Sequence, residues 1–245
     1  MTKVHGRVGV LMGGASAERE VSLRTGEGVA EALESRGHDV VRVVLDRPER
    51  FAETIARAKL DVAFLGLHGR YGEDGCVQGL LELLGVPYTG SSVLSSALAM
   101  DKVKAKELFR LHNVPTPPYF VATADTLAGL ASQHENFGFP VVVKPRSEGS
   151  SVGLAVARDL AGLEAGIASA LEHDDAALVE RFVRGTEVHV ALLGGRVLGA
   201  IEVVPKSGLY DYAAKYTPGA TYYICPPRLP TTRLRGVMNL AERAA

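Results

Sequence analysis

The sequence predicts an α/β protein: an N-terminal domain with a parallel sheet, followed by a smaller α+β unit. In the first hundred residues, short apolar runs alternate with segments of helical pattern. Short apolar strands separated by helices are typical of a parallel sheet that is covered on both faces. After Asp101, a lysine-rich helical segment and a proline-rich stretch precede closely spaced apolar runs. The first domain is therefore expected to be Rossmann-like and the second to be of α+β type.

The elements of the N-terminal domain follow from these apolar runs. Residues 8–12 are expected to form a buried strand. A helix is expected over 17–35, because Gly37 ends the helical pattern. The apolar runs 40–45 and 62–67 predict two further strands, joined by right-handed crossovers.

The second part should begin with a helix over 102–112. That helix should end at a linker, because Val114-Pro-Thr-Pro-Pro118 cannot continue it. The elements expected after the linker are strands over 140–145, 154–157 and 177–180 and a helix over 160–171. The domains expected from these changes of pattern are 1–100, 101–184 and 185–245.

In the last sixty residues, the segment that begins at Glu187 again alternates between two faces of an expected strand. Val188, Val190 and Leu192 fall on one face of an expected strand that begins at Glu187. This strand should pair with a strand over 197–204 through Gly194-Gly195, a two-residue hairpin signal.

A final helix should begin at Pro230, with a threonine as its cap. Its apolar stripe consists of Leu234, Val237, Leu240 and Ala241. The chain stops at Ala245 with nothing after it to cover this stripe. The stripe is therefore expected to be exposed, and the chain to be truncated at its C-terminus.

Composition limits the classes of function. Of the 245 residues, 47% are hydrophobic and 22% charged, the balance of a globular protein. Lys and Arg total 27 against 28 Asp and Glu, so the basic excess of a nucleic-acid-binding protein is missing. No apolar run reaches the roughly 18 residues of a membrane span, and the N-terminus lacks the apolar core of a signal peptide. These features predict a cytoplasmic protein without membrane insertion. Cys76 and Cys225 are too isolated to predict a disulfide framework or a zinc site.

Three glycine clusters could carry chemistry. The chain has neither a G-x-x-x-x-G-K-[ST] motif nor a G-x-G-x-x-G after its first strand, which disfavours P-loop nucleotidases and dinucleotide oxidoreductases. The first cluster, Gly13–Ser22, opens a helix. Its structural alternative is a tight strand–helix turn capped by Ser16, with Glu18 and Glu20 complementing the helix dipole.

The second cluster, Gly149-Ser-Ser-Val-Gly153, matches the G-x-S-x-G elbow of serine hydrolases, in which Ser151 would be the nucleophile. An elbow needs a helix after the serine, whereas a strand is expected over 154–157. The cluster is therefore expected to be a hairpin tip, whose N–H groups and hydroxyls suit a phosphate. Lys144 lies shortly before it. A snorkelling lysine is the structural alternative, and phosphate binding is favoured.

The third cluster, His68-Gly-Arg-Tyr-Gly-Glu-Asp-Gly-Cys-Val-Gln-Gly79, follows an expected parallel strand, where open α/β sheets bind their ligands. It fits, at every position, the signature H-G-x-x-G-E-[DNT]-G-x-x-[QSA]-[GSA] of the D-alanine–D-alanine ligase family, in the ATP-grasp superfamily. Four further blocks resemble that family in its order: Gly13-Gly-Ala-Ser-Ala-Glu-Arg-Glu-Val-Ser22, Met100-Asp-Lys102, Lys144-Pro-Arg-Ser-Glu-Gly-Ser-Ser-Val-Gly153 and Tyr210-Asp-Tyr-Ala-Ala-Lys-Tyr216. The resemblance covers essentially the whole chain and implies that its second part is an ATP-grasp module.

The resemblance implies an ATP-dependent ligase that makes D-alanyl-D-alanine for peptidoglycan precursors. ATP would phosphorylate the carboxylate of a first D-alanine, and the amine of a second would attack the acyl phosphate. Lys102, Lys144 and Lys215 would supply positive charge to ATP, with Lys144 and Lys102 on its α- and β-phosphates. Ser151 would also bind ATP.

The resemblance assigns the nucleoside to the next strands. Glu180 would accept a hydrogen bond from the adenine amino group, and the backbone near Val183 would bind the ring edge. Glu187 would bind the ribose hydroxyls. A solvated strand edge is the structural alternative for either glutamate.

The resemblance also assigns the first D-alanine. Glu18 would hold its ammonium and would be linked through Ser150 to Tyr216 as a catalytic hydrogen-bonded triad, while His68 would lie near its carboxylate. Related D-alanine–D-lactate enzymes replace the Lys-Tyr pair, so Lys215-Tyr216 favours the dipeptide ligase.

Magnesium is implied as well. The family's ligands, an acidic residue followed by a Glu-x-Asn pair, would lie beyond Ala245, so this chain alone is expected to be inactive and to contain no metal ligands. Two alternatives remain: a truncated nucleotide-binding remnant, or another ATP-grasp carboxylate–amine ligase, which should lack the blocks 68–79 and 210–216. Because family members are commonly dimers, a homodimer is also expected.

Overall fold

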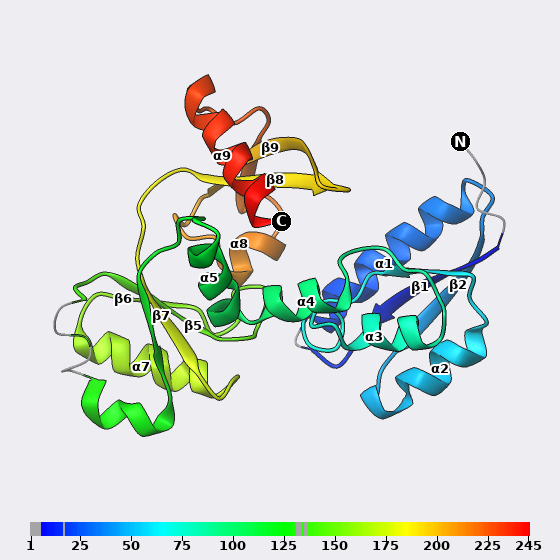
Figure 1. Ribbon diagram of the computed structural model, residues 1–245, viewed down its shortest axis with the longest axis horizontal. Helices are drawn as coiled ribbons and strands as arrows, with labels where there is room; N and C mark the ends of the chain where they lie inside the picture. The colour runs from blue at the N-terminus through cyan, green and yellow to red at the C-terminus, as the bar shows by residue number, and fades with distance from the viewer. Residues whose placement is uncertain (1–5, 17, 131–133, 135–136) are drawn as a thin grey trace. The chain divides into compact units, whose positions relative to one another are not determined.

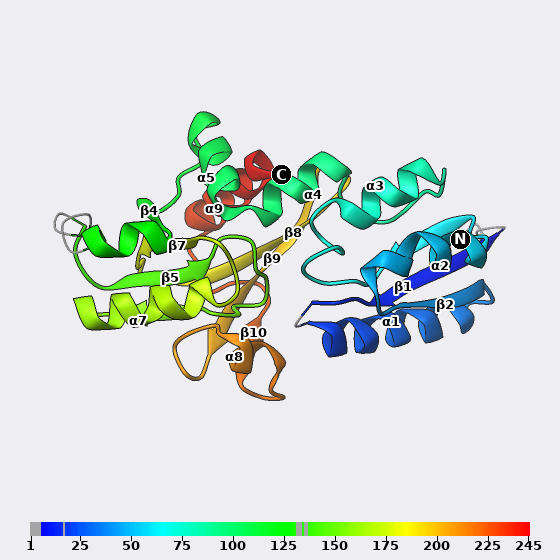
Figure 2. The same cartoon turned by 90° about the horizontal axis from the view of Figure 1, so that it is seen from below.

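The computed structural model describes residues 6–16, 18–130, 134 and 137–245. The chain divides into two compact units, Met1–Asp101 and Lys102–Ala245, and Figures 1 and 2 label most of their helices and strands. Among the described residues, no helix is both long and apolar enough to span a bilayer.

The first unit is built on a three-stranded parallel sheet of order β2-β1-β3. Its strands are β1 (Arg7–Gly13), β2 (Asp39–Leu45) and β3 (Val62–Leu65). Helix α1 (Arg19–Glu34) covers one face of this sheet, and α2 (Phe51–Ala58) lies on the other, as Figure 2 shows. The predicted parallel α/β domain is thereby confirmed.

The second face of the sheet carries most of the core of this unit. Buried Leu11, Leu45 and Ile55 pack there with residues of helix α3 (Cys76–Leu83). The remaining elements are the 3-10 helix η1 (Pro48–Arg50) and helix α4 (Val93–Met100). Strand β3 ends two residues earlier than predicted, and the loop that carries the third glycine cluster starts there.

The start of α1 differs from the predicted cap. Residue 17, where the helix was expected to begin, lies outside the described residues. The capping position is held by Glu18, whose side chain makes no capping hydrogen bond. The hydroxyl of Ser16 instead accepts from the Glu18 N–H at 3.2 Å and donates to the carbonyl of His68 at 2.8 Å. Ser16 therefore ties the helix start to the loop after β3.

The second unit begins with helix α5 (Lys102–Leu111) and a four-stranded antiparallel sheet of order β4-β7-β5-β6. Its strands are β4 (Tyr119–Ala122), β5 (Val141–Pro145), β6 (Ala155–Ala157) and β7 (Ala177–Arg181). Helix α7 (Leu160–Leu171) packs on this sheet through buried Leu163 and Ile167. The 3-10 helix η2 (Ala124–Gly129) follows β4.

Strands β5 and β6 pair antiparallel, which confirms that Gly149–Gly153 belongs to a hairpin connection. Because a strand rather than a helix follows Ser151, the serine-hydrolase elbow is wrong for this chain.

A three-stranded antiparallel sheet of order β10-β9-β8 completes the unit. It consists of β8 (Glu187–Leu193), β9 (Arg196–Pro205) and β10 (Thr221–Ile224), and helix α8 (Tyr212–Tyr216) lies between the last two strands in sequence. The predicted hairpin is confirmed: Gly194 and Gly195 connect β8 to β9, and both have the positive φ that a two-residue turn requires.

Helix α9 (Thr231–Ala244) corrects two predictions. Its capping position is Pro230, and no side chain caps it, so the expected threonine cap is wrong. Its apolar stripe packs against β8 and β9 and is half-buried rather than exposed. The β8–β9 hairpin supplies the cover of this stripe.

Candidate functional site

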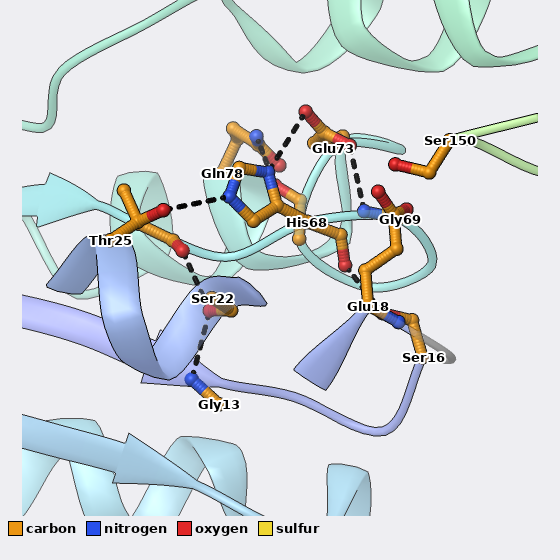
Figure 3. Close-up of polar contacts among 12 residues, drawn as sticks. Gly13, Ser16, Glu18, Ser22, Thr25, His68, Gly69, Glu73, Gln78 and Ser150 are labelled. Carbon is orange, nitrogen blue, oxygen red and sulfur yellow. Dashed lines mark hydrogen bonds and ion pairs between the residues drawn. The ribbon is translucent and has the colours of Figure 1, made fainter. Parts of the chain in front are cut away.

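The site residues of the first unit surround the ends of β1 and β3 (Figure 3). The Gly13 N–H donates to the hydroxyl of Ser22 at 2.9 Å, and this hydroxyl donates to the carbonyl of Gly66 at 2.6 Å. The first turn of α1 is thus fastened to the ends of both strands. The first and third glycine clusters, some fifty residues apart in sequence, therefore lie together.

Glu18 lies inside this junction and is 4% exposed. Gly69 packs against its side chain: a Cβ added to Gly69 would lie 2.9 Å from Glu18 Oε2 and 3.0 Å from the Cβ of Ser16. Gly69 also has φ +68°, where glycine is favoured. The Glu18 carboxylate is therefore buried at the start of α1, and its interpretation as an acid that complements the helix dipole stays open.

His68 is held between two polar side chains at this junction. Its Nδ1 lies 3.8 Å from Glu73 Oε1, and its Nε2 lies 3.5 Å from Thr25 Oγ1. The nearby Glu73 carboxylate raises the pKa of His68 above its usual value. Burial alone would raise the pKa of Glu73, but the His68 imidazole and the Gly69 N–H, which donates at 2.7 Å, hold it below its usual value.

The rest of the third cluster is fixed by its own hydrogen bonds. Asp74 accepts from the N–H groups of Tyr71 at 2.9 Å and Cys76 at 3.1 Å. The side-chain amide of Gln78 donates to the carbonyl of Gly72 at 2.9 Å. The signature segment is therefore a self-supporting loop that presents His68 and Gly69.

In the second unit, α5 directs two lysines toward the ends of the four-stranded sheet. Lys102 Nζ donates to the carbonyls of Glu148 at 2.5 Å and Arg146 at 3.3 Å, in the connection that follows β5. Lys106, one helical turn later, reaches β7 and donates to Glu180 Oε1 at 2.5 Å. Burial, together with the ammonium of Lys144, lowers the pKa of Lys102 to about 8.

Glu180 is the centre of a buried charge cluster. It is 7% exposed, and its second oxygen, Oε2, forms an ion pair with Lys144. Burial alone would raise the pKa of Glu180, but the ammonium groups of Lys144 and Lys106 hold it below its usual value. The solvated-edge alternative is therefore wrong for Glu180. Lys106 was not predicted as a site residue, although its spacing of four from Lys102 puts it on the same helix face.

A cavity of about 650 Å³ opens beside the end of β7. Val183 and Glu187 line it, together with Leu209 and Tyr210 from the connection between β9 and α8. Glu187 is exposed and lies 3.1 Å from His189 Nε2, so its side chain does belong to a solvated strand edge. The cavity has the size of a small-molecule site.

The hairpin tip between β5 and β6 is joined to the tyrosine-rich segment. The Ser150 hydroxyl lies 2.6 Å from the Tyr216 hydroxyl, and the Ser151 hydroxyl donates to the carbonyl of Tyr210 at 3.2 Å. Lys215 Nζ lies 5.4 Å from the centre of the Tyr210 ring. Burial and a hydrogen bond with Tyr223 raise the pKa of Tyr210 to about 12.

The structure thus groups the predicted residues within each unit. Glu18 and His68 lie at one junction of the first unit. In the second unit, Lys144 forms an ion pair with Glu180, and its charge helps to lower the pKa of Lys102. The hydroxyl groups of Ser150 and Tyr216 are joined by a hydrogen bond. Within the described ranges, no group of three or more His, Cys, Asp or Glu is arranged to hold a metal ion. The structure therefore assigns none of these residues to the Mg²⁺ that the resemblance implies.

Comparison with known proteins shows the family of this chain. The family model described as "D-ala D-ala ligase C-terminus" matches residues 108–245, and "D-ala D-ala ligase N-terminus" matches residues 48–91. A D-alanine–D-alanine ligase of Geobacter sulfurreducens is 50% identical over 239 residues, which are 97% of this chain and 74% of that protein. The corresponding ligase of Anaeromyxobacter sp. (strain K) is 49% identical, over 97% of this chain and 77% of its own length.

Solved structures give the same result. The D-alanine–D-alanine ligase of Bacillus anthracis superposes with a TM-score of 0.81 at 34% identity, covering 97% of this chain and 77% of that one. Its complex with ATP gives 0.79 at 31% identity, over 98% of this chain and 76% of that one. VanG D-Ala:D-Ser ligase from Enterococcus faecalis gives 0.80 at 28% identity, over 100% and 82%. With the signature loop, the charge cluster and close relatives over nearly its whole length, this chain belongs to the D-alanine–D-alanine ligase family.

Proposed function

We propose that this chain acts as an ATP-dependent ligase that joins two D-alanines for peptidoglycan precursor synthesis. The observation that carries the proposal is the grouping of Lys102, Lys144 and Glu180 beside a Gly/Ser hairpin connection, in a unit that also contains a ligand-sized cavity. The names of relatives at 46–50% identity support the choice of substrate.

The proposed reaction has two steps. A carboxylate oxygen of the first D-alanine attacks the γ-phosphorus of ATP, and ADP leaves with the electrons of the broken P–O bond. The amine of the second D-alanine then attacks the acyl carbon. Inorganic phosphate leaves and the new amide nitrogen loses its proton. Phosphoryl transfer depends chiefly on positioning and on neutralising phosphate charge, and this is the role we give to Lys102, Lys144 and Lys215.

The nucleoside would occupy the cavity at the end of β7. Val183 and Glu187 line this cavity, which supports their roles toward the adenine ring edge and the ribose hydroxyls. Glu180 would accept from the adenine amino group, and Ser151 would contribute to the phosphate-covering loop.

Glu18 and His68 would bind the first D-alanine. The burial of the Glu18 carboxylate supports its pairing with an ammonium, because a desolvated carboxylate binds a cation more strongly than an exposed one does. The raised pKa of His68 supports its role near the substrate carboxylate. The contact of Ser150 with Tyr216 supports the predicted triad, whose third member is Glu18. A homodimer, Mg²⁺ dependence and a cytosolic location remain predictions.

Calorimetric titration with ATP tests the first half of the proposal. The chain should bind ATP, and Lys144→Ala should weaken binding at least about tenfold, since a charge-assisted hydrogen bond contributes about 1.5–3 kcal/mol. The fold should persist in this variant because Glu180 keeps Lys106 as its partner. Lys104→Ala, at an exposed position of α5, is the matched control. Equal affinities in the two variants would contradict the assignment of Lys144.

Phosphate release tests the second half. With ATP and Mg²⁺ present, residues 1–245 alone should release no phosphate. A version extended to the length of its relatives should release phosphate only when D-alanine is added, and the dipeptide should form in preference to products with D-serine or D-lactate. ATP binding without D-alanine-dependent release in the extended version would favour the nucleotide-binding remnant. Release with another amino acid would favour a different carboxylate–amine ligase.

A further inference from the structure

Lys106 is a buried cation, and each of its three N–H groups has a hydrogen-bond acceptor. Its residue is 4% exposed. The ammonium donates to Thr116 Oγ1 at 2.5 Å, to the carbonyl of Pro117 at 2.9 Å and to Glu180 Oε1 at 2.5 Å. It also lies 4.9 Å from the centre of the Tyr119 ring. An ammonium has three N–H donors, so these three acceptors hold Lys106 as a fixed internal charge.

Lys144 is the opposite kind of cation. Its side chain is 27% exposed and stands near the end of β5, shortly before the hairpin connection that contains Ser150. It pairs with Oε2, the Glu180 oxygen that Lys106 does not occupy. Glu180 therefore has one enclosed partner and one partner within reach of solvent.

Because the two lysines pair with different oxygens of Glu180, a phosphate can bind Lys144 without disturbing Lys106. A phosphate that binds Lys144 competes with Glu180 for the same ammonium. If Lys144 were the sole counter-ion, its departure would leave a buried carboxylate unpaired, which is strongly unfavourable. With Lys106 in place, Glu180 stays ionised and oriented through Oε1, and Oε2 becomes available as an acceptor.

We propose that Lys106 is a positioning residue for nucleotide binding: it holds Glu180 through Oε1, so that Lys144 can transfer from Oε2 to a phosphate and Oε2 can accept from the amino group of adenine. The inference rests on the proposed function, because it takes ATP as the ligand of this cluster. It adds a residue that contacts neither the phosphates nor the base and acts through Glu180.

The test compares three ligands on the whole chain: ATP, ITP, in which an oxo group replaces the adenine amino group, and inorganic tripolyphosphate, which has no base. In Lys106→Met, Glu180 should retain Lys144, and tripolyphosphate should bind about tenfold more weakly than in the wild type. The preference for ATP over ITP should also fall, because Oε2 remains occupied.

A second substitution separates this role from a structural one. In Lys106→Met/Glu180→Gln, no carboxylate competes for Lys144, and tripolyphosphate affinity should return to within about threefold of the wild type. Damage to the linker that contains Thr116 and Pro117 would not be repaired by a change at Glu180. Thr116→Val, which removes one linker contact and leaves the Lys106–Glu180 pair, should bind all three ligands as the wild type does.

The outcomes are distinct. Wild-type affinity for tripolyphosphate in Lys106→Met, or no recovery in the double variant, would overturn the role of Lys106 while leaving the proposed function intact. Failure of the wild-type chain to bind ATP would overturn both. If circular dichroism shows that Lys106→Met does not fold, Lys106→Gln removes the charge, keeps a donor for Glu180 and carries the same expectations.

Discussion

The Ser150 hydroxyl lies 2.6 Å from the Tyr216 hydroxyl and joins the hairpin connection of β5 and β6 to helix α8. Ser150 and Ser151 have φ of +46° and +62°, a conformation that residues other than glycine rarely adopt. Such strain persists only where the surrounding contacts impose it. The Tyr216 hydroxyl is one of those contacts, and the bond therefore links the backbone of the proposed phosphate loop to α8.

Tyr216→Phe should loosen this loop without unfolding the chain. One neutral hydrogen bond contributes about 0.5–1.5 kcal/mol, which corresponds to about a 2- to 10-fold increase in local opening. Hydrogen exchange of the amides in 149–153 should accelerate by this factor, as measured by mass spectrometry. Tyr222→Phe, which removes an exposed hydroxyl of β10, is the control. The same exchange rate in both variants would show that the bond does not hold the loop.

Gly69→Ala and Gly85→Ala form a matched pair in the first unit. Both glycines have φ +68°, so both substitutions carry the same left-handed strain of about 1–2 kcal/mol. A Cβ at Gly85 would meet no described atom within 4 Å, whereas one at Gly69 would meet the Glu18 carboxylate and Ser16. Gly69→Ala should therefore lower the free energy of unfolding by at least about 1 kcal/mol more than Gly85→Ala. Urea unfolding measures the difference. Equal losses would mean that the Glu18 carboxylate moves aside freely.

Glu18→Gln should weaken D-alanine binding far more than ATP binding. The substitution keeps the size of the side chain and removes the charge that we pair with the substrate's ammonium. Losing a desolvated charged partner typically costs at least about 2 kcal/mol, or roughly 30-fold in affinity. Calorimetry with D-alanine in the presence of a non-hydrolysable ATP analogue, and with the analogue alone, separates the two affinities. Glu20→Gln is the control on the exposed side of the same turn. Equal losses for both ligands would make Glu18 a structural residue.

Much of the fold could be predicted because local signals agreed with the tertiary structure. Helix α7 has the predicted bounds, since Asp159 caps it by accepting from the Gly162 N–H at 2.8 Å. Strand β4 was missed because its four residues directly follow the proline linker and pair with β7, far away in sequence. The cover of α9 was missed for the same kind of reason, since a β8–β9 face is created only when the hairpin forms.

The candidate site was less predictable where burial decides the chemistry. Glu180 and Glu187 have the same sequence character, yet the first is enclosed by two lysines and the second is exposed. Lys106 shares a helix with Lys102, but its burial depends on the linker and on Glu180, 74 residues away. Sequence spacing could suggest the helix face of Lys106; its partners required the packed sheet.

The affinity of the chain for ATP should fall as the pH rises above 8. The pKa of Lys102 is lowered to about 8, first by burial and then by Lys144. Phosphate binds the charged ammonium, so binding raises this pKa and takes up a proton in this pH range. Between pH 7 and 9 the affinity should therefore decrease by about tenfold, as calorimetry in buffers of matched ionic strength can measure.

The free energy of unfolding should rise with pH in the range where the affinity for ATP falls. This opposite dependence is the control on the assignment of Lys102 as the titrating group. The unfolded chain keeps the Lys102 proton up to a pKa of about 10.4, whereas the folded chain releases it near 8. The unfolded state thus binds more protons between these values, and the free energy of unfolding should rise with pH there. Lys102→Met should remove the pH dependence of both the ATP affinity and the free energy of unfolding, and should leave a weaker affinity for ATP. Lys104→Met, on the exposed face of α5, should keep both pH dependences. If they persist in Lys102→Met, another group titrates in the site, and Lys102 is not the lysine that meets the phosphate.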